Sequence, residues 1–464
     1  MNLAQALRLS QSTISAHPPA IALVGAGGKT TLLFQLAREL TKSKRRDWAT
    51  PEAARPVIVT ATTHLHIDQI RLADSHWIGE KPEDLAHLKE NIHGVILITG
   101  PVDGERTTGL NGNLMTWLRD FCFKRSLPLL IEADGSRQTP LKAPANHEPV
   151  IPEFVETVVV VVGLTGLGKP LTEKFVHRPE IFARLSGIKI GETITIESLS
   201  HVLTHSSGGL KNIPPQACRI ALLNQADTPE IQAQGQALAK KIQDAYHSIL
   251  IASLKRSQIH AVYEPAAGII LAAGGSSRFG QPKQLLDWHG MPFVRATAES
   301  ALVAGLSPVV VVTGAYAEQV ESALNGLPVL IVRNENWQSG QSTSIRAGLT
   351  ALTHGPSTKS GIECGSAIFL LVDQPQITPS VIRLLTEEHA RTLAPIVAPL
   401  VGGQRANPVL FDRLTFPDLM SLNGDVGGRA IFSKFPVNYM TWHDASLLFD
   451  VDTQEEYRKL VSGE

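Results

Sequence analysis

Cysteine is scarce in this chain of 464 residues, and its three copies stand far apart at positions 122, 218 and 364. No CxxC pair occurs, so the sequence offers neither a disulfide scaffold nor a cysteine zinc site, and its cysteine usage suits a reducing compartment. No apolar run is long enough to cross a bilayer. The N-terminal residues also lack the continuous apolar core of a signal peptide. We therefore expect a cytoplasmic protein with no membrane partner.

Excess charge of either sign is also lacking. Lys and Arg number 42 and Asp and Glu 43, which leaves a formal net charge of -1. Proteins that bind nucleic acid usually show a basic excess or stripe, so no nucleic-acid partner is expected. Hydrophobic residues at 43% and charged residues at 18% are typical of a soluble globular protein. The length exceeds that of one ordinary core and predicts two or three domains.

The most informative stretch is GIILAAGGSSRFGQPKQLL, residues 268–286. Its apolar start predicts a short buried strand. Gly274 and Gly275 follow, and because they lack a Cβ the turn lets backbone N–H groups approach a ligand closely. Arg278 and Lys283 lie on the same loop, so amides and two cations together predict a pocket for a triphosphate. The glycine spacing fits neither the dinucleotide fingerprint nor a Walker A loop, and the alternative is a glycine turn with two solvated cations.

A second glycine-rich loop lies near the N-terminus. An apolar run over 21–24 leads into GAGGKT at 25–30 and then into a helical pattern. In the P-loop arrangement of strand, loop and helix, the loop amides and the lysine hold phosphates and the threonine reaches Mg²⁺. The match is partial, because Leu23 stands where the standard spacing has its first glycine. The predicted nucleotide-binding residues of this loop are Gly25, Gly27, Gly28, Lys29 and Thr30.

Two polar segments follow predicted strands in the first half of the chain. The run 129–131 ends in Glu132 and Asp134, which lie on one side of an extended chain. A carboxylate there could hold Mg²⁺ as a Walker B residue does, and the alternative is a capping aspartate in a turn. The segment 224–227, Asn-Gln-Ala-Asp, resembles the base-reading NKxD loop of GTPases with Gln225 in place of Lys. A simple polar turn explains it equally well.

Strands and helices alternate across residues 20–255, which implies a doubly wound parallel sheet. The continuous β-branched run 158–162 predicts a strand buried on both faces. We expect a first domain over 1–255, a linker over 256–266 and a second α/β domain over 267–464.

The second half also places carboxylates at the ends of apolar runs. The run 367–372 ends at Asp373, and the run 447–451 precedes Asp452. Asp450 and Asp452 share a face if the chain is extended. With Asp373 they could form an oxygen site for Mg²⁺, which takes few carboxylates and relies on substrate phosphates. The alternative for each is a turn or capping residue.

The second half resembles a known family over about 200 residues. Its ordered motifs are LAAGGSSRFGQPK, NENWQSGQSTS, LLVDQP, ANPVLF, NGDVGGR and FDVDTQEEY. They resemble the molybdenum cofactor nucleotidyltransferases, and the LAAG start and DVDT form are most similar to the cytidylyltransferase (MocA) branch. One departure is Gln341, where relatives often have Met.

This resemblance implies a Rossmann-like (GT-A-like) domain that moves CMP from CTP to the phosphate of molybdopterin cofactor and releases pyrophosphate. The implied catalytic residues are Arg278, Lys283 and Asp373, and the implied Mg²⁺ ligands are Asp373, Asp450 and Asp452. The implied nucleotide-binding residues are Leu271, Ala272, Ala273, Gly274, Gly275, Gln341 and Ser344. Those near the pterin-bearing substrate are Asn407, Asp425 and Arg429.

The first half resembles the selenium-dependent hydroxylase accessory family, YqeC. The matching motifs are VGAGGKTTLL, EADGSRQTPLKAPANHEPVIP, GKPLTEKFVHRPE and LNQAD. The resemblance implies a P-loop fold and a link to the maturation of a molybdenum hydroxylase client. The whole chain is thus expected to hold two three-layer α/β domains. Guanylyl transfer to the same cofactor, and a non-catalytic nucleotide-switched carrier or insertion chaperone, remain alternatives.

Overall fold

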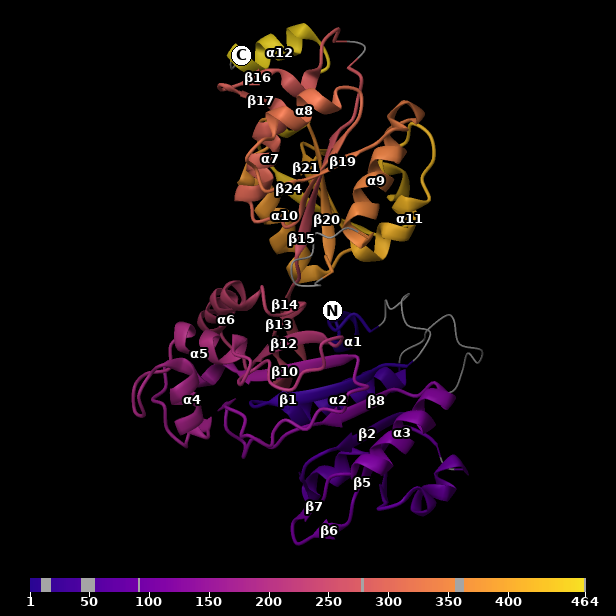
Figure 1. Ribbon diagram of the computed structural model, residues 1–464, viewed down its shortest axis with the longest axis vertical. Coiled ribbons are helices and arrows are strands. Elements are labelled where there is room, and N and C mark those ends of the chain that lie inside the picture. The colour runs from indigo at the N-terminus through magenta and orange to yellow at the C-terminus, as the bar shows by residue number, and fades with distance from the viewer. Residues whose placement is uncertain (10–17, 43–54, 91, 277–278, 355–362, 463–464) are drawn as a thin grey trace. The chain divides into compact units, whose positions relative to one another are not determined.

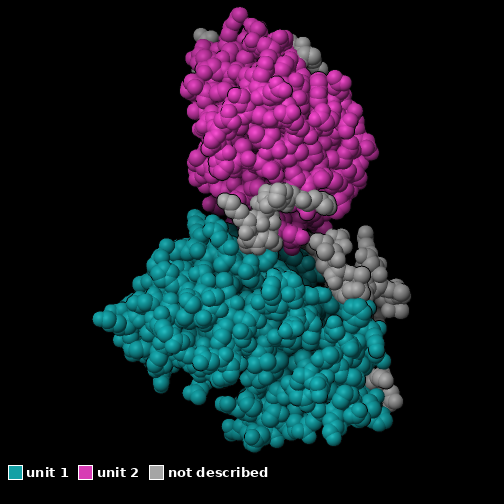
Figure 2. Space-filling view, viewed as in Figure 1, with its two compact units in different colours: residues 1–263 teal, residues 264–464 magenta. Residues whose placement is uncertain are grey.

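The computed structural model describes residues 1–9, 18–42, 55–90, 92–276, 279–354 and 363–462. The chain divides into two compact units, Met1–Tyr263 and Glu264–Glu464 (Figure 2). None of the helices in these ranges combines the length and the apolar character needed to cross a membrane.

The first unit is built on a nine-stranded sheet in the order β14-β13-β12-β10-β1-β8-β2-β5-β4 (Figure 1). Its strands pair in parallel except β14, which runs antiparallel to β13. The strands of the sheet are β1 (Ala20–Gly25), β2 (Val57–Ala61), β4 (Ser75–Ile78), β5 (Val95–Thr99), β8 (Leu129–Glu132), β10 (Thr157–Gly163), β12 (Cys218–Asn224), β13 (Ser248–Ser253) and β14 (Gln258–Tyr263). Short strands outside it are β3 (Leu65–His66), β6 (Val102–Asp103), β7 (Arg106–Thr107), β9 (Leu141–Lys142) and β11 (Val176–His177).

Helices connect these strands. They are α1 (Leu3–Ala6), α2 (Lys29–Lys42), α3 (Gly112–Arg125), α4 (Pro179–Ser186), α5 (Ile196–Thr204) and α6 (Pro229–Ile242). Ala22 and Val24 of β1 share a core cluster with side chains of α3, α5 and α6. Alternate residues of a strand point to opposite faces, and α2 packs on β1, β2 and β8. Strand β10 lies between β12 and β1 in this sheet, and its valines on both faces are buried, as the β-branched run predicts.

The second unit holds a sheet in the order β19-β18-β15-β20-β23-β21-β22, with β24 beside β21. Its strands are β15 (Ala266–Ala272), β18 (Val309–Thr313), β19 (Leu330–Arg333), β20 (Ser366–Leu371), β21 (Ile396–Val401), β22 (Gln404–Arg405), β23 (Val409–Asp412) and β24 (Val437–Trp442), and a separate hairpin joins β16 (Asp287–Trp288) to β17 (Met291–Pro292). The helices are α7 (Phe293–Val303), α8 (Ala317–Ala323), α9 (Gln341–His354), α10 (Pro379–Thr392), α11 (Phe416–Met420) and α12 (Gln454–Ser462).

Both faces of this sheet are covered. Ile270 packs in one core cluster with α7 and α10, and Ile269 packs in another with α9 and α11. Figure 1 shows these helix pairs on opposite sides of β15 and β20. The predicted α/β class is thus confirmed in both units. The second sheet is mixed, because β23 runs antiparallel to both β20 and β21, while β15 pairs in parallel with β18 and β20.

Two expectations differ from the structure. Residues 258–263, placed in the linker, form β14, because Ala261 and Val262 are apolar enough to be buried against β13. The run 447–451 is not a strand, since it contains a 3-10 turn over Ala445–Leu448 and then continues extended without a sheet partner. Alternate side chains of this segment still point to opposite sides, and Phe449 and Val451 pack into a small core cluster.

The place of β14 generates a test with two fragments of the first unit. A fragment of residues 1–255 lacks β14, so it exposes the hydrogen-bonding edge of β13 and loses the buried Val262 side chain. Burial of one such side chain is worth about 1.5–3 kcal/mol, and we expect this fragment to melt about 5 °C or more below residues 1–263. Calorimetry of the two fragments measures the difference. Equal melting temperatures would show that β14 does not belong to this folding unit.

Candidate functional site

The loop after β15 and the end of β20 meet at one edge of the second sheet, because the two strands are parallel neighbours. Lys283 lies on the loop, and Asp373 lies two residues beyond β20. The Lys283 Nζ is 3.7 Å from Asp373 Oδ2 and 2.6 Å from Asp452 Oδ1. The structure therefore brings the predicted cation to two of the predicted carboxylates.

A buried glutamine holds this loop in place. Gln284, 1% exposed, donates from Nε2 to the carbonyl oxygens of Ala272 at 3.1 Å and Gly274 at 2.6 Å. The Ser276 Oγ accepts from the backbone N–H of Lys283 at 3.1 Å. A Cβ on Gly275 would lie 3.0 Å from the Trp337 ring, so a side chain there is crowded. Sequence reasoning missed Gln284, whose role depends on carbonyls that only the folded loop presents.

Asp373 has a buried carboxylate oxygen that is able to accept a ligand. Its Oδ1 is buried, and no hydrogen-bond partner for it lies in the described ranges. Burial raises the pKa of Asp373 to about 6, against the lowering effect of Lys283, and Asp450 and Asp452 raise it further. The backbone of Val451 donates to the Asp373 carbonyl at 3.0 Å and brings the two segments together.

Asp450 completes this edge. Its Oδ1 accepts from Gln374 Nε2 at 2.5 Å, and the charge of Arg429 acts on it. No three His, Cys, Asp or Glu side chains of the described part form a metal cluster by themselves. Two carboxylates beside a glycine-rich loop still suit Mg²⁺, since that ion usually completes its shell with waters and substrate phosphates.

The residues predicted near the base gather at the start of α9. Gln341 donates its backbone N–H to Asp425 Oδ1 at 3.2 Å. Ser344 is buried, and its Oγ accepts from Asn334 Nδ2 at 3.0 Å. Gly340 has φ +106°, and a Cβ there would lie 2.5 Å from Asp425 Cα. Ser344 thus supports the loop from inside, while Gln341 and Asp425 are exposed.

The other predicted site residues have fewer contacts with the groups described above. Leu271, Ala272 and Ala273 lie at the end of β15, as expected of a strand that delivers the loop. Asn407 lies between β22 and β23, and no contact within the described residues joins it to the other predicted groups. Arg278 lies outside the described residues.

The glycine loop of the first unit is tightly enclosed. Gly25, Gly27 and Gly28 have φ of +96°, +85° and +133°. A Cβ on Gly25 would lie 2.3 Å from the carbonyl oxygen of Val161, and one on Gly27 would lie 2.5 Å from Gly163 Cα. The loop needs glycine because it passes directly against the end of β10.

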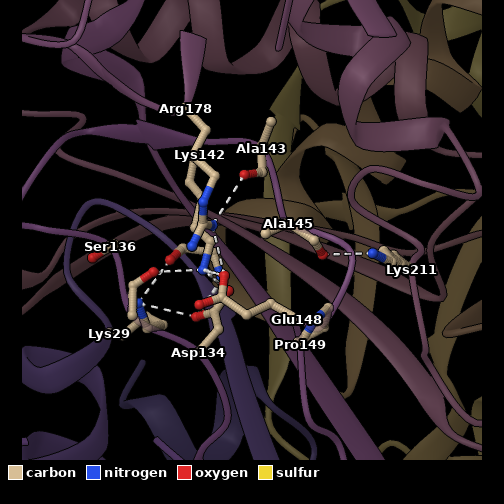
Figure 3. Close-up of polar contacts among 12 residues, drawn as sticks. Lys29, Asp134, Ser136, Lys142, Ala143, Ala145, Glu148, Pro149, Arg178 and Lys211 are labelled. Carbon is tan, nitrogen blue, oxygen red and sulfur yellow. Dashed lines mark hydrogen bonds and ion pairs between the residues drawn. The ribbon is translucent and has the colours of Figure 1, made fainter. Parts of the chain in front are cut away.

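Lys29 points beneath this loop into a buried ionic cluster (Figure 3). Its Nζ lies 2.7 Å from the Gly25 carbonyl oxygen and 3.2 Å from Asp134 Oδ1. Asp134 also accepts from the backbone N–H of Gly25 at 3.0 Å. Burial alone would lower the pKa of Lys29, but Asp134 and Glu132 outweigh it and raise that pKa.

Three further charged side chains extend the cluster, as Figure 3 shows. Lys142 Nζ is 2.8 Å from Asp134 Oδ2 and 2.7 Å from Glu148 Oε2. Arg178 donates to the same Glu148 oxygen at 2.7 Å. Burial would raise the pKa of Glu148, but hydrogen bonds from Arg178 and Lys142 lower it to about 2. Sequence reasoning assigned these three no role, although they fall within its LKAPANHEP and VHRPE motifs.

Glu132, the last residue of β8, and Asp134 both lie near Lys29 but differ in their other contacts. Glu132 Oε2 accepts from Thr30 Oγ1 at 3.3 Å, and Gln69 donates to the same hydroxyl at 3.0 Å. Asp134 instead accepts from the backbone N–H of Gly25 and is the nearer of the two carboxylates to Lys29. Glu132 is therefore the carboxylate that contacts Thr30.

The low pKa of Glu148 generates a test of the cluster. Because that pKa lies below its unfolded value of 4.5, the carboxylate stabilises the first unit above pH 4.5, and this contribution is lost as the pH falls toward 2. We expect Glu148→Gln to destabilise the unit by about 2–3 kcal/mol at pH 7, and by roughly half that or less at pH 3. The free energy of unfolding is measured by urea unfolding, with hydrogen exchange in peptides from β10 as the signal for the first unit. Glu153→Gln, at an exposed neighbour, is the control, and an equal loss at both pH values would contradict the ionic account.

Comparison with known proteins connects each unit to a family. The family described as "YqeC protein" matches residues 21–180, and the family described as "MobA-like NTP transferase domain" matches residues 268–439. The Escherichia coli protein named "Uncharacterized protein YqeC" is 35% identical over 212 residues, which cover 44% of this chain and 74% of that protein.

The second unit has its own relatives. "Nicotine blue oxidoreductase" of Paenarthrobacter nicotinovorans is 34% identical over 204 residues, covering 42% of this chain and 95% of that protein. A "Probable molybdenum cofactor guanylyltransferase" of Bacillus cereus is 26% identical and covers 41% and 93%. The crystal structure of Rv0371c from Mycobacterium tuberculosis is 27% identical, covers 43% of this chain and 98% of that chain, and has a TM-score of 0.37. The chain belongs to the YqeC family through its first unit and to the MobA-like NTP transferase family through its second.

Proposed function

We propose that the second unit transfers CMP from CTP to the phosphate of molybdopterin (molybdenum) cofactor and releases pyrophosphate. The observation that carries the proposal is the meeting of Lys283, Asp373 and Asp452 at one sheet edge, directly after a glycine-rich loop. Backbone amides and a cation could bind the phosphates of a triphosphate there, and the carboxylates could bind its metal ion.

The reaction needs little covalent help from the protein. A phosphate oxygen of the cofactor attacks the α-phosphorus of CTP, a new P–O bond forms, and the bond to the β-phosphate oxygen breaks as pyrophosphate leaves. Both reactants are anions, so in-line positioning and neutralisation of charge account for most of the rate. Lys283 and the amides of Gly274 and Gly275 would bind the triphosphate and the departing pyrophosphate, and Arg278 is assigned the same role. Mg²⁺ would supply Lewis-acid stabilisation of the phosphoryl oxygens, held by Asp373 and Asp450, with Asp452 as a further ligand.

Lys283 has two roles in this scheme. Without substrate it neutralises Asp373 and Asp452, and its side chain is 14% exposed. When a cation reaches the carboxylates, their charge is balanced from another source, and Lys283 becomes available to a phosphate. In this scheme the ion pair between Lys283 and the two aspartates is replaced by two contacts. The aspartates bind the cation, and Lys283 binds the phosphate.

The base and the second substrate are set by the loops around α9. We assign the base contact to Gln341, whose backbone N–H donates to Asp425, and the pterin-bearing substrate to Asn407, Asp425 and Arg429. The Bacillus cereus relative is named a guanylyltransferase, so GTP is the second candidate donor. Pyrophosphate release measured separately with CTP and GTP decides between them.

The first unit is proposed as an accessory domain for the maturation of a molybdenum hydroxylase, with phosphates bound at Gly25–Thr30. Support comes from the three glycines with positive φ, from Lys29 beneath the loop, and from the contact between Thr30 and Glu132. Its fusion to a transferase unit suggests that the two act on the same product in sequence.

Two substitutions test the transferase site. Lys283→Ala removes a phosphate contact that serves ground and transition states, so CTP binding weakens and turnover falls together. Asp373→Asn keeps the shape but removes a metal-binding charge, and we expect turnover to fall roughly a thousandfold, about 4 kcal/mol. Pyrophosphate release with CTP, Mg²⁺ and cofactor measures both.

The matched control for the lysine is Lys434→Ala. Lys434 also forms a 2.6 Å ion pair, with Asp418, but on the exposed surface. The Lys434→Ala protein should release pyrophosphate at the normal rate. Near-normal activity of Asp373→Asn would remove that residue from the site, and absence of pyrophosphate with every NTP would favour a non-catalytic carrier.

A further inference from the structure

The polar segment that follows β12 reaches back to the glycine loop of the first unit. Asn224, 5% exposed, donates from Nδ2 to the Gly27 carbonyl oxygen at 2.7 Å. Its Oδ1 accepts from the backbone N–H of Leu254 at 3.0 Å. One buried side chain therefore ties together the glycine loop, the end of β12 and the turn after β13.

Asp227 is held in a fixed orientation beside this tie. The Ser253 hydroxyl donates to its Oδ1, and the Arg256 guanidinium donates to its backbone carbonyl oxygen at 2.9 Å. Across the described ranges, no side chain or backbone group is bonded to Asp227 Oδ2. The half-buried carboxylate thus presents one oxygen oriented by Ser253 and one oxygen open to a ligand.

A cavity of about 480 Å³ adjoins the same turn. Its lining includes Thr30 and Thr31, which follow the glycine loop, and Leu254 and Ser257, which follow Ser253. Gln35 also lines it, with a buried Oε1 that has no hydrogen-bond partner in the described part of the chain. The volume is in the range of small-molecule sites. The cavity borders the start of α2 and the turn after β13, and neither Asp227 nor the loop glycines are among its lining residues.

Hydrogen-bond chemistry selects the base that suits this carboxylate. Guanine presents two adjacent donors, N1–H and the 2-amino group, which a carboxylate accepts with both oxygens or with one oxygen and a close neighbour. Adenine presents a donor beside an acceptor, so a carboxylate would face the N1 lone pair and lose a hydrogen bond. Cytosine and uracil likewise place acceptors next to their donors.

From this arrangement we infer that the first unit binds a guanine nucleotide, with Asp227 reading the base edge, Ser253 orienting Asp227, and Asn224 fixing the turn against the phosphate loop. The inference rests on the proposed phosphate site at Gly25–Thr30 and adds the identity of the base. Gln225, which replaces the lysine of the NKxD pattern, contacts Thr165 instead of this region.

The test uses the full chain carrying Lys283→Ala, which weakens nucleotide binding at the transferase site. Calorimetric titrations with GDP, ADP and CDP should show GDP binding at least tenfold more tightly than the other two. Asp227→Asn should weaken GDP binding at least tenfold. It should also strengthen binding of xanthosine diphosphate, because the new amide donates to the 2-oxo group that xanthine has in place of the amino group.

This exchange of specificity keeps the test sharp, since a variant that merely unfolds cannot gain affinity for a second ligand. Asp244→Asn, at an exposed carboxylate after α6, is the control and should leave both affinities unchanged. Lys29→Ala reports on the phosphate loop and should abolish binding of all three diphosphates. Because Lys29 is buried against Asp134, circular dichroism must show that this variant is folded before its binding is interpreted.

The possible failures are distinguishable. Equal affinities for GDP and ADP that are both lost in Lys29→Ala would overturn the base assignment and leave the phosphate loop intact. Absence of diphosphate binding, or binding unaffected by Lys29→Ala, would overturn the phosphate loop itself. An Asp227→Asn protein that binds GDP normally and gains no affinity for xanthosine diphosphate would also overturn the inference.

Discussion

The same interaction organises both units, a lysine that follows a glycine loop and is paired with an aspartate beyond the neighbouring parallel strand. Lys29 meets Asp134 across β1 and β8 at 3.2 Å, and Lys283 meets Asp373 across β15 and β20 at 3.7 Å. Parallel neighbours end at one edge, so each central strand delivers its loop to a carboxylate. The two ion pairs differ in how far their side chains are exposed. The side chains of the first pair are 2% and 3% exposed and those of the second 14% and 26%. A buried pair is costly to break, whereas the more exposed pair of Lys283 and Asp373 is easier to separate.

Much of this edge could be predicted from the sequence. Short apolar runs such as 269–271 and 158–162 form the expected strands, because β-branched and apolar residues are buried on both faces of a parallel sheet. Residues that follow such strands, Lys283 and Asp373 among them, must then lie at the carboxyl edge. Strand order in the sheet brings them together, and local pattern alone does not give strand order. The predicted roles of the site residues remain predictions.

Other parts depend on tertiary contacts that leave little local signal. Gln284 and Gln374 look like surface residues in the sequence, yet they are buried and bond to carbonyls or to Asp450. The sequence predicts a linker where β14 lies, because the pairing of β14 with β13 is a tertiary contact that the local pattern does not show. The cluster of Lys142, Glu148 and Arg178 joins segments far apart in the chain, and no spacing rule connects them.

The central claim is that the edge holding Lys283, Asp373 and Asp450 is where the triphosphate and its metal bind. It is tested most directly by a crystal structure of the full chain with Mn²⁺ and a non-hydrolysable CTP analogue, using anomalous scattering to locate the metal. The account predicts a manganese peak bound by Asp373 and Asp450 and by phosphate oxygens, with Lys283 moved from Asp373 to the triphosphate. A triphosphate bound elsewhere on the second unit, with the ion pair between Lys283 and Asp373 unchanged, would contradict it.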